Sequence, residues 1–184
     1  MQALSGQITA SALLALLKDG ALAGEWILDP HTSSIRLTNR AVGGLVRVNG
    51  VFREISGNCT VFPDGEVTGT LMVAAASIDT KNTRRDVHLR SADFLDSDTY
   101  PDITFTAEAI RSSGLGVSMS GSLTVCGRTR PLSFDAAASV RGNGEVWIDA
   151  EVIINRADFG LTWNVLGMAS MNNTLTIHAA FTRR

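Results

Sequence analysis

The segment from Ser77 to Phe105 holds the densest group of side chains able to do chemistry. Its charged and titratable members include Arg84, Arg85, Asp86, His88, Arg90 and Asp93. In a structural interpretation, Arg85, Asp86, Arg90 and Asp93 form a hydrogen-bonded clasp that fixes a short helix on the rim of the fold. In a functional interpretation, Arg84, Arg85, His88 or Arg90 contacts an anionic ligand head group. The two interpretations are compatible, and the first is the default.

Catalysis has weaker support in the sequence. The chain has three histidines, His31, His88 and His178, predicted to lie on a turn, a short helix and a strand. His88 is two positions from Asp86, and residues two apart on a helix do not face each other. The chain has no nucleophile elbow, phosphate loop or H-x-x-x-H metal pair. We therefore expect no enzyme activity, cofactor or metal, with an enzyme using rim residues around His88 as the alternative.

The two cysteines do not indicate a metal site. Cys59 and Cys126 each fall within a predicted strand, with no CxxC motif or Cys/His cluster near either. Two separately buried thiols are expected. A single disulfide remains the alternative.

Composition narrows the class of protein. A chain of 184 residues is most simply one domain that can bury a sizeable core. Hydrophobic residues make up 45%, charged residues 18%, and the net charge is -2, which argues against disorder and against nucleic acid as a partner. No apolar run is long enough for a membrane span. The 17 glycines and many Val, Ile, Thr and Ser residues favour an all-β fold.

The amino terminus predicts a helix outside the β-fold. Residues 8–19 can form this helix, with Thr9 or Ser11 as its cap and Gly20 closing it. We assign residues 1–23 to a helical extension and residues 24–184 to the β-domain. We expect this helix either to pack on the barrel or to mediate a homodimer. A cytoplasmic protein is expected because the first seven residues lack Lys and Arg, although Ala21-Leu-Ala23 resembles a signal-peptide cleavage site and leaves secretion as the alternative.

Alternating apolar residues predict most of the strands. About eight such strands, most near ten residues long, are typical of an up-and-down antiparallel barrel. One long strand is expected to run from Val46 to Phe62 with a break at Ser56-Gly57. Between the strands, Asn82 can cap the short crossover helix, and Asp86 and Arg90 are spaced for an i,i+4 ion pair.

The predicted inner faces are rich in small residues. These residues are Gly50, Gly121, Ala136, Ala138, Ala150 and Ala179. An eight-stranded barrel is either filled by its own side chains or holds one small ligand. Small inward residues supply less volume than a close-packed interior needs, so an apolar cavity is expected.

Several motifs resemble those of the YceI-like family, also described as polyisoprenoid-binding or extended-lipocalin proteins. The resemblance runs from about Trp26 to the carboxyl end. The motifs that carry it are Leu28-Asp-Pro-His-Thr-Ser33, Val48-Asn-Gly-Val-Phe52, Ser77-Ile-Asp-Thr80 with Arg85-Asp86-Val-His88-Leu89 and Asp93-Phe94, Tyr100-Pro-Asp-Ile-Thr-Phe105, Gly121-Ser-Leu-Thr-Val-Cys-Gly127 and Asn155-Arg-Ala-Asp-Phe-Gly160. The chain departs from the family at Asn39-Arg40. The resemblance implies a lipocalin-like barrel whose elongated cavity holds an isoprenoid or similar long-chain amphiphile without catalysis.

A binding or carrier protein for a polyprenyl lipid or a quinone is therefore the leading hypothesis. Ordinary core packing is the alternative role for each predicted lining residue. The predicted lining residues are Phe52, Phe94, Phe105, Leu123, Phe134, Ile148, Phe159, Leu161, Trp163 and Ile177. The loop of residues 159–170 is a candidate lid over the cavity.

Overall fold

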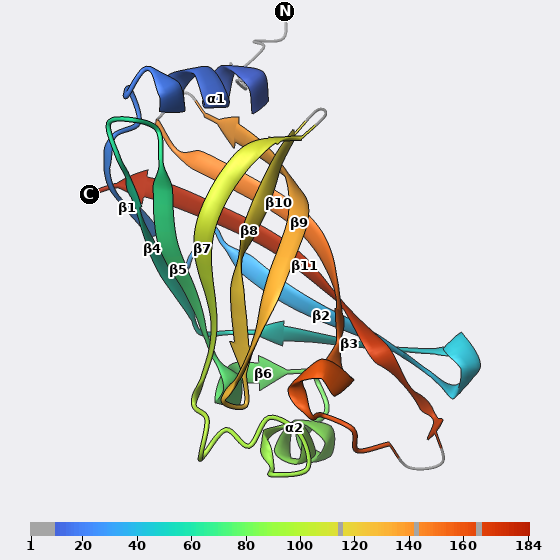
Figure 1. Cartoon of the computed structure of the whole chain (residues 1–184). Helices are drawn as coiled ribbons and strands as arrows, with labels where there is room; N and C mark the ends of the chain where they lie inside the picture. The colour runs from blue at the N-terminus through green and yellow to red at the C-terminus, as the bar shows by residue number, and fades with distance from the viewer. Residues whose placement is uncertain (1–9, 114–115, 142–143, 165–166) are drawn as a thin grey trace, which may run out of the picture.

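The computed structural model describes residues 10–113, 116–141, 144–164 and 167–184 as a barrel with a helix at each end (Figure 1). Its helices are α1 (Ala10–Lys18) and α2 (Thr83–Arg90), with 3₁₀ turns η1 (Val42–Gly44), η2 (Ala75–Ser77) and η3 (Arg156–Phe159). Its strands are β1 (Gly24–Leu28), β2 (Ser34–Ala41), β3 (Val46–Phe52), β4 (Ile55–Val61), β5 (Val67–Ala74), β6 (Ile78–Asp79), β7 (Asp102–Ser113), β8 (Gly116–Val125), β9 (Arg128–Val140), β10 (Val146–Asn155) and β11 (Ala169–Arg183).

Eight strands close into a ring. Their order is β1-β4-β5-β7-β8-β9-β10-β11, and β11 returns to pair with β1. All of these pairings are antiparallel, and the closing register places Trp26 opposite Arg183 and Leu28 opposite Phe181. The predicted eight-stranded antiparallel barrel, with one crossover helix and one N-terminal helix, is confirmed.

Three further strands extend this ring. The first part of β11 pairs with β2, β2 pairs with β3, and the short β6 pairs with β3. The predicted long strand from Val46 to Phe62, with its break at Ser56-Gly57, is wrong. It is two strands, interrupted at Arg53 and Glu54, and Ser56-Gly57 lies inside β4. The buried positions change from even-numbered residues in β3, Gly50 and Phe52, to odd-numbered residues in β4, Ile55 and Val61. This change of phase marks the point where the chain passes from one strand to the next.

The alternation of buried side chains in β8 follows the predicted pattern. Val117, Gly121, Leu123 and Val125 are buried, as expected for one face of a strand. Opposite Gly121, β7 carries a bulge between Ala107 and Ala109. A Cβ atom at Gly121 would collide with the carbonyl oxygen of Thr106. The bulge therefore needs glycine at this position because a second backbone approaches too closely for any side chain.

Helix α1 lies across one end of the barrel (Figure 1). Leu13 and Leu17 are buried in one cluster with the barrel residues Trp26, Val61 and Val67. Gly20 follows the helix at φ +69°, a left-handed conformation that glycine adopts readily, and its N–H donates to the carbonyl of Leu17. Ser11 lies inside the helix, and the other predicted cap, Thr9, lies outside the described residues, as does most of the assigned extension before α1.

Replacing Gly121 tests the bulge. We expect Gly121→Ala to lower the free energy of unfolding by about 1–3 kcal/mol, since the new methyl group must displace backbone. The neighbouring Ser120→Ala change is the control and should stay within about 0.5 kcal/mol of the parent. Urea unfolding followed by circular dichroism measures both, and equal stability of the two variants would contradict the close-approach explanation.

Candidate functional site: an apolar cavity along the barrel axis

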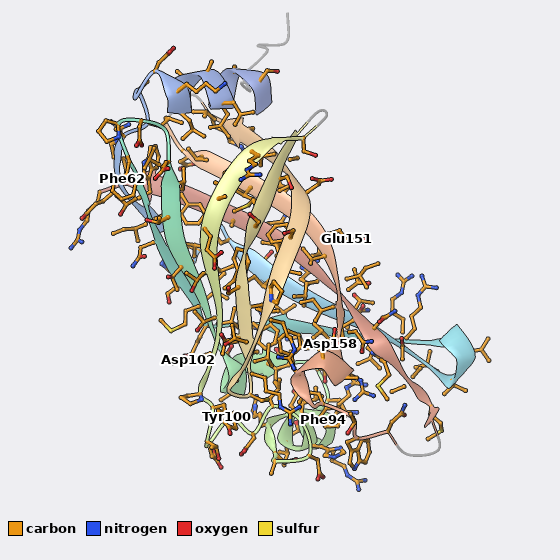
Figure 2. The ribbon with its side chains drawn as sticks, in the orientation of Figure 1. Phe62, Phe94, Tyr100, Asp102, Glu151 and Asp158 are labelled. Carbon is orange, nitrogen blue, oxygen red and sulfur yellow. The ribbon has the colours of Figure 1, made fainter. Side chains whose placement is uncertain are left out.

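An apolar cavity of about 230 Å³ runs inside the barrel. It is far larger than the roughly 10–15 Å³ needed to hold one water molecule. Leu13 and Leu17 of α1 line one end, and Leu95, Phe159 and Leu161 line the other. Figure 2 shows the length of the barrel between these ends, with Phe62 labelled beside the α1 end and Phe94 at the α2 end.

Most of the predicted lining residues border this cavity. They are Phe52, Phe105, Leu123, Phe134, Ile148, Phe159, Leu161 and Ile177. Phe94 and Trp163 are not among the described lining residues. Trp26, which the sequence analysis left out, lines the cavity, and its indole N–H donates to the carbonyl of Leu22 at 2.9 Å. Contact of these residues with a ligand stays a prediction.

The small residues that were expected to create the cavity have other roles in the structure. Of the six named, only Ala179 lines the cavity. A Cβ at Gly50 would lie 2.8 Å from Cδ1 of Ile78, so this glycine makes room for β6. Ala136, Ala138 and Ala150 belong to the buried cluster that contains the α1 leucines. The cavity is predicted correctly, but the reason given for it is largely wrong.

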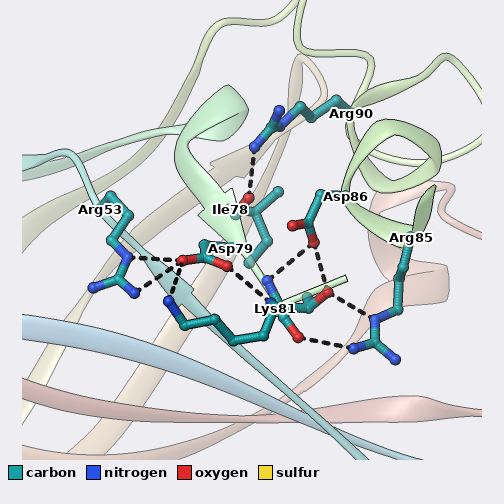
Figure 3. A network of polar contacts seen from close by, with 8 residues as sticks. Arg53, Ile78, Asp79, Lys81, Arg85, Asp86 and Arg90 are labelled. Atoms are coloured by element: carbon teal, nitrogen blue, oxygen red, sulfur yellow. Dashed lines mark hydrogen bonds and ion pairs between the residues drawn. The ribbon is translucent and has the colours of Figure 1, made fainter. Parts of the chain in front are cut away.

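Helix α2 is fixed to the segment before it by hydrogen bonds (Figure 3). Asp86 is buried, and its Oδ1 accepts from the N–H and hydroxyl of Thr80 at 3.0 and 2.6 Å. The Arg85 guanidinium donates to the hydroxyl and carbonyl oxygens of Thr80, and Arg90 Nη2 donates to the carbonyl of Ile78 at 2.8 Å. Asn82 caps the helix by accepting from the N–H of Arg85 at 3.1 Å.

This clasp contains most of its predicted members, with different partners. Asp86 and Arg90 do not form the expected i,i+4 ion pair; within the described chain each binds residues 78–80 instead.

A second group of polar contacts surrounds Asp79. The pKa of Asp79 is lowered first by the hydrogen bond from the Lys81 N–H and then by the side chains of Arg53 and Lys81. A carboxyl whose pKa is lower in the folded than in the unfolded state stabilises the fold at pH values above its unfolded-state pKa. The stabilisation that Asp79 contributes is therefore lost as the pH falls toward its lowered pKa in the folded state.

The cations proposed as head-group contacts lie apart from the cavity lining. Arg85 and Arg90 donate to the segment before α2, as the clasp requires, and Arg84 is exposed. His88 lies 3.2 Å from Asp93, Nε2 to Oδ2. None of these four is among the described residues that line the cavity, and their contact with a head group stays a prediction.

His88 instead connects α2 to the candidate lid. Its ring packs edge-on against Trp163 and Phe94, with centroids 4.3 and 5.1 Å apart. Trp163 belongs to the loop of residues 159–170, of which residues 165–166 lie outside the described chain. Phe94 and Trp163 therefore hold the loop against α2, whereas they were predicted to contact the ligand.

The other histidines do not assemble into a catalytic group with His88. His178 Nδ1 lies 2.6 Å from Asp149 Oδ1 across the β10–β11 pairing, and His31 is exposed in a turn. Within the described residues, no three His, Cys, Asp or Glu side chains gather as metal ligands. In the same part of the chain, no helix is both long enough and apolar enough to cross a membrane.

One functional candidate escaped the sequence analysis. Arg156 at the start of η3 lines the cavity and is only 4% exposed. Its pKa is lowered by burial, which disfavours the charged form. The sequence motif that could have revealed this position is Asn155-Arg-Ala-Asp-Phe-Gly160. In the structure it forms a tight turn, in which the Asn155 side chain accepts a hydrogen bond from the N–H of Ala157 and Gly160 has a left-handed backbone conformation.

Both cysteines are free thiols in the structure. Cys59 lines the cavity, and burial raises its pKa to about 11. Cys126 Sγ donates to the carbonyl of Leu95 at 3.2 Å, and its pKa is raised first by burial and then by Asp96. The expectation of two separate thiols agrees with this geometry.

The closed antiparallel ring around an axial cavity defines a lipocalin-like β-barrel. A family model described as a YceI-like domain matches residues 26–182. The chain is also 33% identical over 136 residues to Protein YceI of Escherichia coli O6:H1 (strain CFT073), with 70% of each chain covered. The chain therefore belongs to the YceI-like family.

Two solved structures share the fold at lower identity. Burkholderia cenocepacia BcnA matches with a TM-score of 0.75 at 19% identity, covering 83% of this chain and 98% of that one. A polyisoprenoid binding domain from Saccharophagus degradans matches with a TM-score of 0.72 at 16% identity, covering 86% and 98%. At these identities the likeness concerns the fold.

The raised pKa of Cys59 predicts slow alkylation. In a Cys126→Ser background, only Cys59 can react with iodoacetamide. At pH 8 we expect Cys59 to react about 100-fold more slowly than a thiol of pKa 9 does, because only the thiolate reacts. The rate should rise about tenfold per pH unit up to pH 10. Mass spectrometry of the alkylated protein gives the rate, glutathione serves as the exposed reference, and a rate equal to glutathione's would contradict the buried position.

Proposed function

We propose that this protein binds one long-chain isoprenoid or similar amphiphile in its barrel cavity and acts as a carrier without catalysis. The observation that carries the proposal is the apolar lining that continues from Leu13 and Leu17 of α1 to Phe159 and Leu161. Burying apolar surface yields about 25 cal/mol per Å², so a chain of several isoprene units needs few polar contacts to bind.

The shared fold with the polyisoprenoid binding domain from Saccharophagus degradans supports this ligand class. A polyprenyl lipid and a prenylated quinone both offer an apolar chain of the required kind. The aromatic rings that border the cavity, such as Phe105 and Phe134 with centroids 5.5 Å apart, can pack against branched isoprene units.

The amino-terminal helix has a role within one chain under this proposal. Leu13 and Leu17 close the cavity at the α1 end, and their burial uses much of the apolar face that a dimer contact would need. A homodimer stays a separate prediction, checked by the solution mass of the protein with and without residues 1–22.

Native mass spectrometry of gently purified protein tests the ligand class directly. A co-purified lipid would add its own mass to the protein, and fragmentation would identify an isoprenoid series. Protein that takes up neither a co-purified lipid nor added geranylgeraniol would overturn the proposal.

A large residue at Ala107 should block the cavity. Ala107 is buried on β7 and lines the cavity, so the ring in Ala107→Phe would occupy the space that an apolar chain needs. We expect affinity for geranylgeraniol to fall more than about tenfold, since more than about 1.4 kcal/mol of packing is lost.

The matched control is Thr106→Phe. Thr106 is the preceding residue on the same strand and is exposed, so the same ring is added to the outer face. Calorimetric titration should give parental affinity for this control. Parental affinity for Ala107→Phe as well, with both proteins folded by circular dichroism, would place the binding site outside the barrel.

A further inference from the structure

Arg156 is the one charged side chain among the described residues that line the cavity. The other polar side chains there are Asn58, Cys59, Thr70 and Asn173, all neutral or, for the thiol, kept protonated by burial. A single buried cation in an apolar wall is unusual because removing a charge from water is costly unless the charge is paired. The position therefore calls for a specific explanation.

Backbone carbonyls hold most of the guanidinium. Nε donates to the carbonyl of Ser170 at 3.1 Å, and Nη1 donates to those of Leu161 and Trp163 at 2.6 and 2.9 Å. These bonds tie η3 to the loop that follows it and to the start of β11. Nη2, by contrast, is buried and has no hydrogen-bond partner within the described residues.

The charge of Arg156 has no carboxylate partner among the described residues, although its guanidinium carbon lies 5.6 Å from the centroid of the Phe94 ring. None of the ion pairs formed by the described residues includes it. Burial lowers its pKa, but a guanidinium stays protonated in proteins at physiological pH. Three carbonyl dipoles satisfy part of the donor set without neutralising the charge. The contact with the Phe94 ring is a weak cation–π interaction and does not neutralise the charge either. The site thus combines an unused donor with a positive charge that no carboxylate of the described residues balances, and an anionic oxygen acceptor would satisfy both.

We infer that Arg156 receives the oxyanion head group, carboxylate or phosphate, of a single-chain lipid held in the cavity. This inference rests on the proposed function and adds the head-group class and the direction of binding. The head group lies at the η3 end, beside Phe159 and Leu161, and the chain extends toward Leu13 and Leu17 at the α1 end.

The inference moves the head-group contact away from α2. Arg85 and Arg90 already donate to Thr80 and Ile78, and Arg84 is exposed on the helix. Arg90 Nε is also buried without a partner, but Arg90 is not among the described lining residues. Of the residues that the structure describes, only Arg156 brings both a buried charge and an unused donor to the cavity wall.

Matched ligands separate the head group from the chain. The probes are hexadecanoate, geranylgeranyl phosphate and geranylgeraniol, titrated into the parent protein and into Arg156→Gln. We expect the variant to lose about 10- to 100-fold in affinity for an oxyanion probe, the range of a hydrogen bond to a charged group. Its affinity for geranylgeraniol should stay within about twofold. Comparing the loss of affinity for hexadecanoate with the loss for geranylgeranyl phosphate shows whether Arg156 prefers a carboxylate or a phosphate.

Arg36→Gln is the control for net charge. It removes one positive charge from an exposed site on the outer face of β2 and should leave all three affinities at the parental level. An equal oxyanion loss in both variants would overturn the assignment to Arg156. Equal binding of oxyanions and geranylgeraniol by the parent would overturn it as well, while leaving the proposed function intact. Failure of every probe to bind would instead overturn the proposed function.

A measurement on the parent protein avoids any folding defect of Arg156→Gln. Hexadecanoate labelled with ¹³C at its carboxyl carbon is bound and titrated by NMR. Contact with the guanidinium should place the bound carboxyl pKa below about 4.3, the value of an unperturbed glutamate side chain. A carboxyl buried in the apolar wall away from Arg156 would have a raised pKa, and that result would contradict the inference.

Discussion

The pairing of β11 with β1 is the contact on which the rest of the molecule depends. Three residues at the end of the chain, Phe181 to Arg183, turn an open sheet into a ring by pairing with Leu28 to Trp26. Closure removes the sheet edges that would otherwise remain unpaired, and it fixes the diameter of the interior. The same β11 also pairs with β10 along ten positions, so one strand sets both the seam and the wall that carries Ile177 and Ala179 into the cavity.

The two ends of this ring are closed by different forces. At one end, α1 contributes leucines to the barrel core, and its contact is mainly apolar packing. At the other end, α2 is held by charge-assisted hydrogen bonds between Asp86, Arg85 and Thr80. Packing without directional bonds yields to an apolar guest more readily than a buried hydrogen-bonded network, in which every broken bond leaves an unsatisfied group. The two closures therefore differ in kind, with apolar packing at α1 and directional hydrogen bonds at α2.

The sequence predicts the parts of the structure that obey local periodicity. Strand alternation predicts the barrel and puts Phe105 and Leu123 on its inner face, where both line the cavity, because a strand has only two faces. The cap at Asn82 follows from its side chain alone. Phe94 and Trp163 lie in irregular segments, where no period says which way a ring points. Gly50 and Gly121 were read as space for a ligand, whereas close approach of Ile78 and of the Thr106 backbone decides their role.

Arg156 shows why the most informative residue of the site was missed. Charged residues are expected outside a core, so periodicity assigns an arginine to solvent. Its burial depends on carbonyls at Leu161, Trp163 and Ser170, which the turn at the left-handed Gly160 brings back over η3. A structural role alone would be met by those three bonds, and an apolar residue of similar volume would often stabilise the wall as well or better. The remaining donor, and a charge that has the Phe94 ring but no carboxylate beside it among the described residues, are what packing leaves unexplained. A ligand with a negatively charged end would give both a partner.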